Sequence, residues 1–238
     1  MTRRRWIADE VSGNRAVLRG AHAAHLVTVL RARVGQEFEI STGTLVRQGR
    51  IIKIAPDQVE FELGDEISAS STPKIILLLS IFKFDRMEWA IEKCTELGVA
   101  QIVPVIAQRS DAHLAAAATK RGERWRRIAR QASEQSRRES QPQIFQPAKL
   151  KDALKLEAGT RIVLAEVEHD LSLKAALESH LPGSSVALAL GPEGGWSGTE
   201  LAMFRDSGWI AASLGNTILR AETAAVAALA ITLSELRD

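Results

Sequence analysis

The sequence predicts an α/β fold in two domains, a small β-rich module followed by a larger domain built on a parallel β-sheet. Three observations carry this prediction. Residues 1–70 contain short strand-like runs separated by turn signals, residues 68–73 are small and polar and end in proline, and residues 74–238 alternate apolar runs with helical segments. Strands that alternate with helices form parallel sheets covered by helices on both faces. The 238 residues are enough to give each domain a core.

The first module reads as β structure with one helical segment. Two of its runs are strand-like, and a third alternates apolar and polar side chains with a period of two. Glycine, asparagine, proline and aspartate mark the turns between them. The expected elements are strands at 36–40, 45–54 and 59–63, turns at Gly13-Asn14 and Pro56-Asp57, and a helix at 23–31. The linker at 68–73 places the domain boundary between residues 70 and 74.

The second domain repeats strand and helix. Its strands are continuous apolar runs of the kind that are buried on both faces of a parallel sheet. Its helices carry capping signals, with Asp85 and Glu88 spaced as a capping box, Gly98 as a stop, and Ser197 with Glu200 as a second capping box. The expected strands are 75–82, 102–106, 161–165, 185–190 and 209–214, and the expected helices are 85–98, 119–138, 197–208 and 222–236.

Three loops follow the last three of these strands. Ala165-Glu166 follows one strand, Gly191-Pro192-Glu193-Gly194-Gly195 follows the next, and residues 214–220 follow the last. Ligands of parallel sheets bind beyond the carboxyl ends of the strands, and glycines let backbone approach a ligand closely because no Cβ intervenes. The three loops together predict one small-molecule site, although glycines also end strands for purely structural reasons.

Charge is unevenly distributed along a chain whose net charge is only +2. Residues 1–33 hold seven arginines against two carboxylates, residues 120–138 hold eight basic residues against two glutamates, and residues 57–66 hold five acids and no base. Basic patches of this kind are typical of polyanion-binding surfaces. A solvated helix is the alternative for residues 120–138, since Glu123 with Arg127 and Glu134 with Arg138 have i,i+4 spacing.

Several function classes do not fit the sequence. The chain lacks the spacings of a phosphate-binding nucleotidase loop and of a dinucleotide fold, and Gly195-Trp196-Ser197-Gly198 is not spaced as a nucleophile elbow. The five histidines and Cys94 form no metal-ligand spacing, so no metal is expected and Cys94 is assigned to the core. The apolar runs are shorter than the ~20 residues of a membrane span. Asp9 and Glu10 interrupt any signal peptide, which favours a cytoplasmic protein.

Five separated blocks of the sequence resemble one family in the same order. They are the run from His25 to Arg31, Lys83-Phe84-Asp85-Arg86-Met87-Glu88 with Glu96-Leu97-Gly98, Glu134-Gln135-Ser136-Arg137-Arg138 before Pro142, Gly191-Pro192-Glu193-Gly194-Gly195-Trp196-Ser197, and Leu214-Gly215 with Ile218-Leu219-Arg220-Ala221-Glu222-Thr223-Ala224. The chain thereby resembles the bacterial uridine N3-methyltransferases of 16S ribosomal RNA, which belong to the SPOUT superfamily. The family usually has arginine where this chain has Thr217.

The resemblance implies a fold, a cofactor and partners. The fold is a SPOUT-type parallel sheet with a trefoil knot at residues 74–238, preceded by a PUA-like β-barrel that binds RNA at residues 1–70. The cofactor is S-adenosylmethionine, and the substrate is 16S rRNA or the assembled small ribosomal subunit. A homodimer is implied as well.

The resemblance also implies roles for individual residues. Arg220 is expected to stabilise the negative charge that develops on uracil when N3 loses its proton, and an ion pair with Glu222 is the alternative role for Arg220. Glu193 or Glu222 is expected to accept that proton or to orient Arg220, so the base is not assigned to one residue, and Glu222 alternatively serves only the dipole of the last helix. The residues expected to hold the cofactor are Ala165, Glu166, Leu190, Gly191, Glu193, Gly194, Leu214, Gly215, Asn216, Ile218, Leu219 and Arg220. The residues expected to contact RNA are Arg3, Arg4, Arg31, Arg33, Lys83, Arg86, Arg137 and Arg138.

Two other functions compete with this expectation. A non-catalytic RNA-binding or ribosome-assembly protein would use the basic faces alone and leave the glycine loops structural. An enzyme for a small anionic metabolite would act without RNA and would depend little on salt, whereas RNA binding weakens steeply as salt rises.

Overall fold

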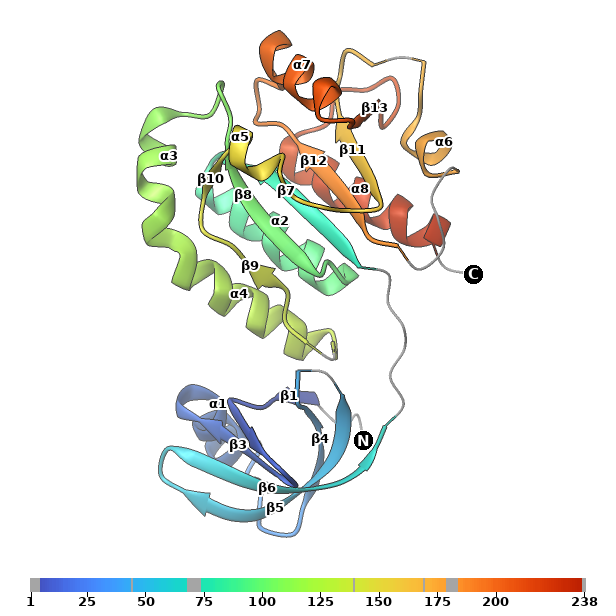
Figure 1. The fold of residues 1–238 in the computed structure, drawn as a ribbon. Helices are drawn as coiled ribbons and strands as arrows, with labels where there is room; N and C mark the ends of the chain where they lie inside the picture. Colours follow the sequence, from blue (N-terminus) through green and yellow to red (C-terminus); the bar gives the residue numbers. More distant parts are fainter. Residues whose placement is uncertain are drawn as a thin grey trace. The chain divides into compact units, whose positions relative to one another are not determined.

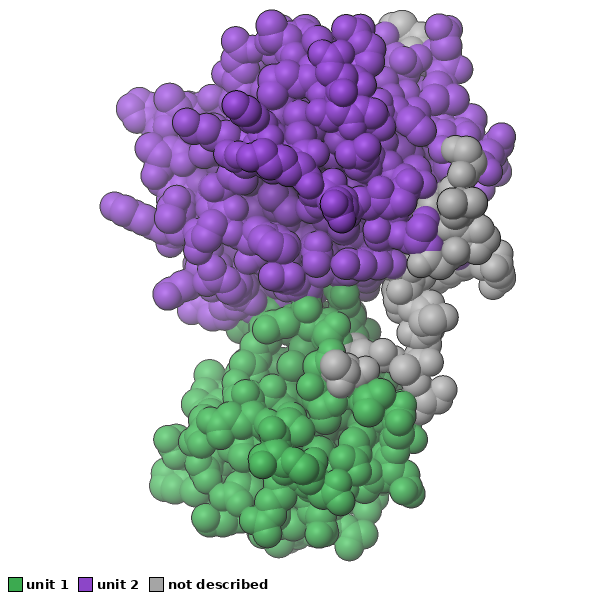
Figure 2. Space-filling model, viewed as in Figure 1, with its two compact units in different colours: residues 1–71, 130–141 green, residues 72–129, 142–238 purple. Residues whose placement is uncertain are grey.

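The computed structural model describes residues 5–43, 45–67, 74–138, 140–168, 170–178 and 184–236. The chain folds as two compact units, drawn in Figure 2. Unit 1 comprises residues 1–71 and 130–141, and unit 2 comprises residues 72–129 and 142–238. The expected linker at 68–73 lies outside the described residues, as do Arg3 and Arg4.

Unit 1 is a six-stranded sheet that curls into a barrel (Figure 1). Its strands run in the order β1-β4-β5-β6-β3-β2, and only β1 and β4 are parallel. The two edge strands follow one another in the chain: Ala8 donates its amide to Ser41 of β4, while Asp9 donates to Val17 of β3. This short connection therefore links the two edge strands of the curled sheet. The strands are β1 (Arg5–Ile7), β2 (Glu10–Ser12), β3 (Arg15–Arg19), β4 (Glu37–Ser41), β5 (Val46–Ala55) and β6 (Gln58–Glu66).

In unit 1, the strands predicted from longer sequence patterns are confirmed. β4, β5 and β6 lie within a few residues of the expected strands, and both turns form where expected. The helical segment begins earlier than predicted, as α1 (Gly20–Ala24) followed by a π-helix (His25–Val29). β1, β2 and β3 were not predicted, because runs of three to five residues carry too little periodicity.

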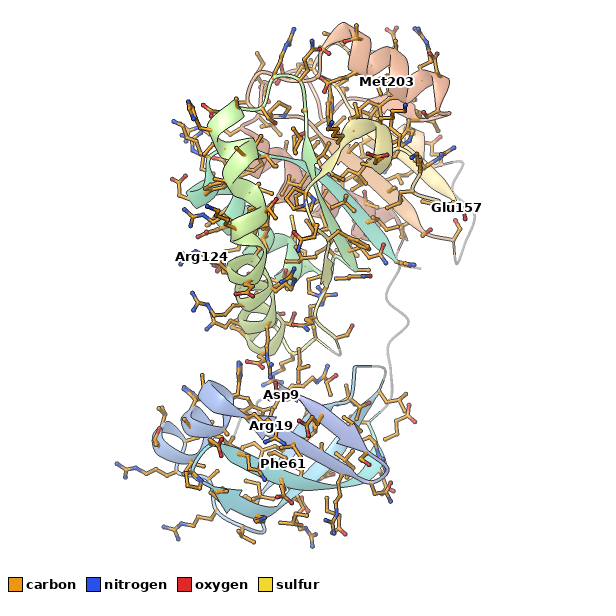
Figure 3. All side chains as sticks on the ribbon, turned by 60° about the vertical axis from the view of Figure 1, so that its left-hand side comes forward. Asp9, Arg19, Phe61, Arg124, Glu157 and Met203 are labelled. Carbon is orange, nitrogen blue, oxygen red and sulfur yellow. The ribbon has the colours of Figure 1, made fainter. Side chains whose placement is uncertain are left out.

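An ion-pair network ties residues 130–141 into unit 1. Arg130 donates to the carboxylate of Asp9 at 2.5 Å and pairs with Glu134 at 3.3 Å. Glu134 also pairs with Nδ1 of His22 at 2.9 Å. Asp9 in turn accepts the amide of Arg19, and Figure 3 labels both residues. Burial pushes the pKa of Asp9 upward, but the hydrogen bonds from Arg130 and from the Arg19 amide hold it below its ordinary value.

Unit 2 is built on a parallel sheet, as predicted. The order is β10-β8-β7-β12-β11-β13, with β9 also paired to β8, and every pairing is parallel. β12 therefore lies between β7 and β11, and β13 pairs with the other side of β11. The strands are β7 (Ile75–Ser80), β8 (Gln101–Ile106), β9 (Gln143–Ile144), β10 (Ala148–Lys149), β11 (Thr160–Leu164), β12 (Val186–Leu190) and β13 (Ile210–Ala212).

Helices cover both faces of this sheet (Figure 1). Alternate residues of β7 separate into two cores, with Ile75, Leu77 and Leu79 facing α2, α4, α6 and α8, and Ile76 and Leu78 facing α5 and α7. This alternation follows from the period of two in a strand. The helices are α2 (Phe84–Leu97), α3 (Ala112–Ala117), a 3₁₀ turn (Ala118–Arg121), α4 (Gly122–Gln135), α5 (Leu150–Ala153), α6 (Leu173–Leu177), α7 (Gly198–Asp206) and α8 (Ala221–Leu236).

The helix boundaries confirm some capping signals and correct another. Gly98 ends α2 with a φ of 114°, and Ser197 with Glu200 forms the predicted capping box of α7. The capping box predicted at Asp85 and Glu88 is wrong. α2 begins earlier, with Lys83 as its N-cap residue and no side-chain cap, so Asp85 lies within the first turn.

Cys94 lies in the core of unit 2, as expected. It is fully buried, and burial raises the pKa of its thiol to about 12. Within the described ranges, no helix is long and apolar enough to cross a membrane.

Candidate active site

The three predicted loops meet at the carboxyl ends of neighbouring strands in the parallel sheet. β11 is paired with β12 on one side and with β13 on the other, and Val163 lies opposite both Ala189 and Ala211. The three strands run in the same direction, so their carboxyl ends are adjacent. The loops after Leu164, Leu190 and Ala212 therefore surround a single place at the end of the sheet, where parallel sheets bind their ligands.

The loop after β12 folds tightly back on itself. The amide of Gly195 donates to the carbonyl of Pro192 at 2.8 Å, and Gly195 has a φ of +66°. A Cβ on Gly191 would lie 3.2 to 3.3 Å from the backbone of Gly195 and Trp196. Glycine at 191 thus permits a turn that a side chain would push open.

The loop after β8 holds this turn from the other side. Arg109 donates from Nη1 to the carbonyl of Gly194 at 2.6 Å. The buried carboxylate of Glu200 accepts the amide of Gln108 at 2.7 Å and the amide of Ser197 at 2.9 Å. β7 lies between β8 and β12 in the sheet, so these contacts reach across the end of β7. We call Gln108, Arg109, Glu200 and their partners Gly194 and Ser197 the clamp.

The loop after β13 offers unpaired backbone amides. It is anchored at Ser213, whose amide donates to Leu171 and whose carbonyl accepts from Leu173, both at 2.9 Å. From Leu214 to Arg220, no backbone amide donates to any group in the described part of the chain. Gly215 has a φ of +119°, and Ile218 is 82% exposed. Consecutive free amides beside an exposed aliphatic side chain are suited to a ligand with polar edges and apolar faces.

A hollow of about 360 Å³ adjoins the end of this loop. It is lined by residues near the starts of α2 and α8, and these two helices pack on each other. Nε of Arg86 lies 3.7 Å from Oε1 of Glu222. Oε2 of Glu222 is buried and has no hydrogen-bond partner among the described residues. The lining residues are Asp85, Arg86, Trp89, Arg220, Glu222 and Thr223.

The expected cofactor and catalytic residues lie on these loops and beside this hollow. Ala165 and Leu190 are buried at strand ends, Gly191, Leu214 and Leu219 are partly buried, and Glu166, Glu193, Gly194, Gly215, Asn216, Ile218 and Arg220 are exposed. The structure brings Arg220 and Glu222 to the same hollow, but Glu222 pairs with Arg86 rather than with Arg220. Glu193 lies in the β12 loop and does not line the hollow. Thr217 is exposed.

The expected RNA-contacting residues are divided between the two units. Lys83 and Arg86 lie at the start of α2 in unit 2, whereas Arg31, Arg33, Arg137 and Arg138 belong to unit 1. Arg31 and Arg137 are exposed, and both have positive φ angles, 52° and 59°. Arg138 is partly buried, and burial lowers the pKa of its guanidinium to about 10, so that it remains charged at neutral pH.

Five residues of this region are not among the expected site residues, although Asp85 and Glu200 are among the expected capping residues. Gln108, Arg109 and Glu200 belong to the clamp, and Asp85 and Trp89 line the hollow. The loop after β8 could have been included, because it also follows a parallel strand and carries polar residues. Trp89 gave no comparable signal, since one tryptophan in a helix normally packs in the core.

Two domain families match the chain. The RNA methyltransferase domain matches residues 69–233, and the RNA methyltransferase PUA domain matches residues 18–64. The first match covers well over half of the chain and contains all three loops, the clamp and the hollow.

Relatives align along most of the chain. Ribosomal RNA small subunit methyltransferase E of Bacillus subtilis is 31% identical over 221 residues, which cover 88% of this chain and 86% of the relative. The protein of the same name from Synechocystis is 34% identical, over 88% of this chain and 70% of the relative.

Solved structures share the fold over nearly the full length. Ribosomal RNA small subunit methyltransferase E of Neisseria gonorrhoeae, bound to S-adenosylmethionine, superimposes with a TM-score of 0.84 at 29% identity, over 98% of this chain and 97% of that one. A putative methyltransferase of Legionella pneumophila, also in complex with S-adenosylmethionine, gives a TM-score of 0.81 at 27% identity, over 98% and 96%. With its methyltransferase domain, its PUA domain and these relatives along most of its length, the chain belongs to the ribosomal RNA small subunit methyltransferase E family.

Proposed function

We propose that this protein transfers a methyl group from S-adenosylmethionine to N3 of a uridine in 16S rRNA of the small ribosomal subunit. The observation that carries the proposal is the run of unpaired amides from Leu214 to Arg220, next to the glycine turn that begins at Gly191. A structure of a relative bound to S-adenosylmethionine supports this loop as part of a cofactor site. The comparisons favour this function over a non-catalytic RNA-binding protein and over an enzyme for a small metabolite.

The residues of the three loops fit S-adenosylmethionine. An adenine ring needs hydrogen-bond donors at its edge and an apolar slot for its faces, which free amides and the side chains of Leu214, Ile218 and Leu219 offer. The exposed carboxylate of Glu166 is suited to ribose hydroxyls or to the amino group of the methionine part. We assign cofactor binding to Ala165, Glu166, Leu190, Gly191, Glu193, Gly194, Leu214, Gly215, Asn216, Ile218, Leu219 and Arg220.

Bound S-adenosylmethionine supplies an electrophilic methyl group on a sulfonium. The protein must remove the N3 proton of uracil and hold N3 in line with that methyl group, and such positioning is a large source of rate enhancement. Loss of the proton moves negative charge onto the two carbonyl oxygens of uracil. The guanidinium of Arg220 stabilises that charge. Glu222, close to Arg220 at the start of α8, and Glu193, in the β12 loop, are the candidate proton acceptors.

RNA is held mainly through phosphate contacts. Unit 1, with the PUA-domain match, serves as the RNA-binding domain within residues 1–70, and residues 74–238 form the catalytic domain. Arginine and lysine neutralise phosphates and so position RNA without reading its sequence. We assign RNA contact to Arg3, Arg4, Arg31, Arg33, Lys83, Arg86, Arg137 and Arg138.

A trefoil knot, a homodimer and a cytoplasmic location complete the proposal. The strand order supports the knot, because the chain passes from β11 to β12 on one side and then to β13 on the opposite side of β11. The partly exposed Val226 and Ile231 of α8, which also pack against the core of unit 2, are compatible with a subunit contact. Sedimentation of the purified protein tests the dimer.

The decisive experiment supplies the protein with labelled S-adenosylmethionine and with small ribosomal subunits that lack the modification. Label is expected in N3-methyluridine at a single position of 16S rRNA. Label at another base atom would overturn the substrate assignment, and no label together with no cofactor binding in calorimetry would overturn the enzyme. RNA binding is expected to weaken steeply with salt, with a slope set by the number of phosphates neutralised.

A further inference from the structure

Trp89 is a large aromatic residue that packing does not explain. The buried stripe of α2 consists of Met87, Ala90, Ile91, Cys94 and Thr95, and Trp89 lies outside it. Its side chain is 45% exposed, and it is the single aromatic among the strongly exposed large apolar residues in the described ranges. An exposed indole on a rigid helix offers a flat face at low conformational cost, as stacking platforms for nucleobases do.

The charges of the hollow around Trp89 are balanced. Arg86 and Arg220 carry positive charge, and Asp85 and Glu222 carry negative charge. A site for a phosphate would hold an excess of cations, because an anion must be neutralised. Two cations offset by two carboxylates favour instead a neutral ligand that has polar edges.

The guanidinium of Arg86 is attracted to the carboxylate of Glu222 but makes no hydrogen bond to it. Its Nε is 3.7 Å from the carboxylate of Glu222, too far for a hydrogen bond, and no hydrogen bond from its guanidinium to another described group is found. The buried Glu222 thus fixes the position of the guanidinium while the N–H groups remain available. Carbonyl oxygens are suitable acceptors for them, and uracil carries two, one on each side of N3.

The hollow also adjoins the loop that we assign to the cofactor. Arg220 lines it and is at the same time the last residue of the loop with the free amides. Its volume of about 360 Å³ falls within the range of small-molecule sites.

We propose that this hollow is the subsite for the target nucleobase, in which Trp89 stacks on the uracil ring and Arg86, positioned by Glu222, donates to one of its carbonyl oxygens. The proposal rests on the proposed rRNA methylation and adds to it where the base lies. A base in this subsite is turned out of its RNA stack, as enzymes that modify a base inside folded RNA require.

A double-mutant cycle between protein and RNA tests the subsite by binding alone. Dissociation constants are measured for wild type and Trp89→Ala with two synthetic RNAs, one containing the mapped target uridine and one abasic at that position. Trp89→Ala is expected to weaken binding of the intact RNA about 5- to 150-fold, the usual range for one stacked base. It is expected to leave binding of the abasic RNA unchanged, since no ring is then present to stack.

Controls separate stacking from other effects. Trp89→Phe keeps an aromatic face and is expected to restore most of the affinity. Glu157→Ala, at an exposed residue of unit 2 that is assigned to neither the cofactor site nor the RNA site, is expected to change neither constant. The affinity of Trp89→Ala for S-adenosylmethionine is expected to equal that of wild type, which also shows that the variant is folded.

The outcomes distinguish the subsite from the overall function. Equal losses of affinity for intact and abasic RNA in Trp89→Ala would overturn the subsite. So would a Trp89→Ala variant that sediments differently from wild type but shows no difference between the two RNAs, because Trp89 would then serve a subunit contact. A wild type that binds no S-adenosylmethionine and transfers no methyl group would overturn the proposed function itself.

Discussion

Replacing Glu200 with glutamine is expected to loosen the clamp and destabilise unit 2. The buried Glu200 carboxylate accepts two backbone amides, Gln108 at 2.7 Å and Ser197 at 2.9 Å, and the residue is only 5% exposed. Glutamine has the same shape but only one acceptor oxygen, so its NH₂ group must face one of the two amide donors. One charge-assisted hydrogen bond is lost, and one buried N–H is left without an acceptor.

The size of the effect follows from this geometry. Hydrogen bonds to charged groups contribute about 1.5–3 kcal/mol, and an unsatisfied buried donor costs a similar amount, so Glu200→Gln is expected to lower the free energy of unfolding by about 1.5–3 kcal/mol. With a denaturant slope of about 2 kcal/mol/M, the urea midpoint falls by about 0.8–1.5 M. Amide hydrogen exchange at Gln108 and Ser197 is expected to accelerate about 10- to 150-fold.

Glu157→Gln is the matched control, because Glu157 is exposed and no hydrogen bond or ion pair of its side chain is found among the described residues. It is expected to change the unfolding free energy by less than about 0.5 kcal/mol. The clamp reasoning would be refuted if Glu200→Gln matched the control in urea and left the exchange of both amides unchanged.

Three further predictions concern other parts of the molecule. Gly215→Ala places a Cβ on a residue with a φ of +119°. The variant is expected to weaken binding of S-adenosylmethionine about 5- to 150-fold in calorimetry, reflecting about 1–3 kcal/mol of backbone strain. Gly198 has open space around it and no positive φ, so Gly198→Ala is expected to bind the cofactor as wild type does. The pKa of Asp9 is lowered from 3.8, so its carboxylate stabilises unit 1 above that pH and loses this contribution as the pH falls through the folded pKa. Wild type and Asp9→Asn are therefore expected to differ in urea midpoint at about pH 6 and to converge in stronger acid. A difference that stays constant with pH would contradict this. Cys94, buried and with a thiol pKa of about 12, is expected to resist iodoacetamide at about pH 8 in the folded protein and to react once urea unfolds it; rapid alkylation of the native protein would show the thiol to be accessible.

Local patterns in the sequence predicted much of unit 2. The apolar runs of β7, β8, β11 and β12 are long enough to define strands, and Gly98 and Ser197 mark helix ends through backbone conformation and capping. The loops after the strands could be assigned to one edge because parallel strands share a direction. The separated motifs identified the family, which the domain matches and relatives confirm.

Other features of the site have no local signature. The clamp joins Arg109 to Gly194 and Gln108 to Glu200, pairs that are 85 and 92 residues apart in the chain. The capping box predicted at Asp85 failed for a related reason, since α2 starts at Phe84, whose ring packs in an edge-to-face contact on Trp125 of α4. A cap signal is worth about 1 kcal/mol, which packing of an aromatic side chain can exceed.

The sequence by itself determined the two-part α/β organisation, the three loops and the family, because periodicity, glycine and capping residues act over a few neighbouring positions. Only the tertiary structure decided the rest. It joined both edges of the barrel through Ala8 and Asp9, placed β12 between β7 and β11, and brought Trp89, Arg86 and Glu222 to one hollow beside Arg220. These arrangements depend on contacts between residues far apart in the chain, whose energies exist only once the fold has formed.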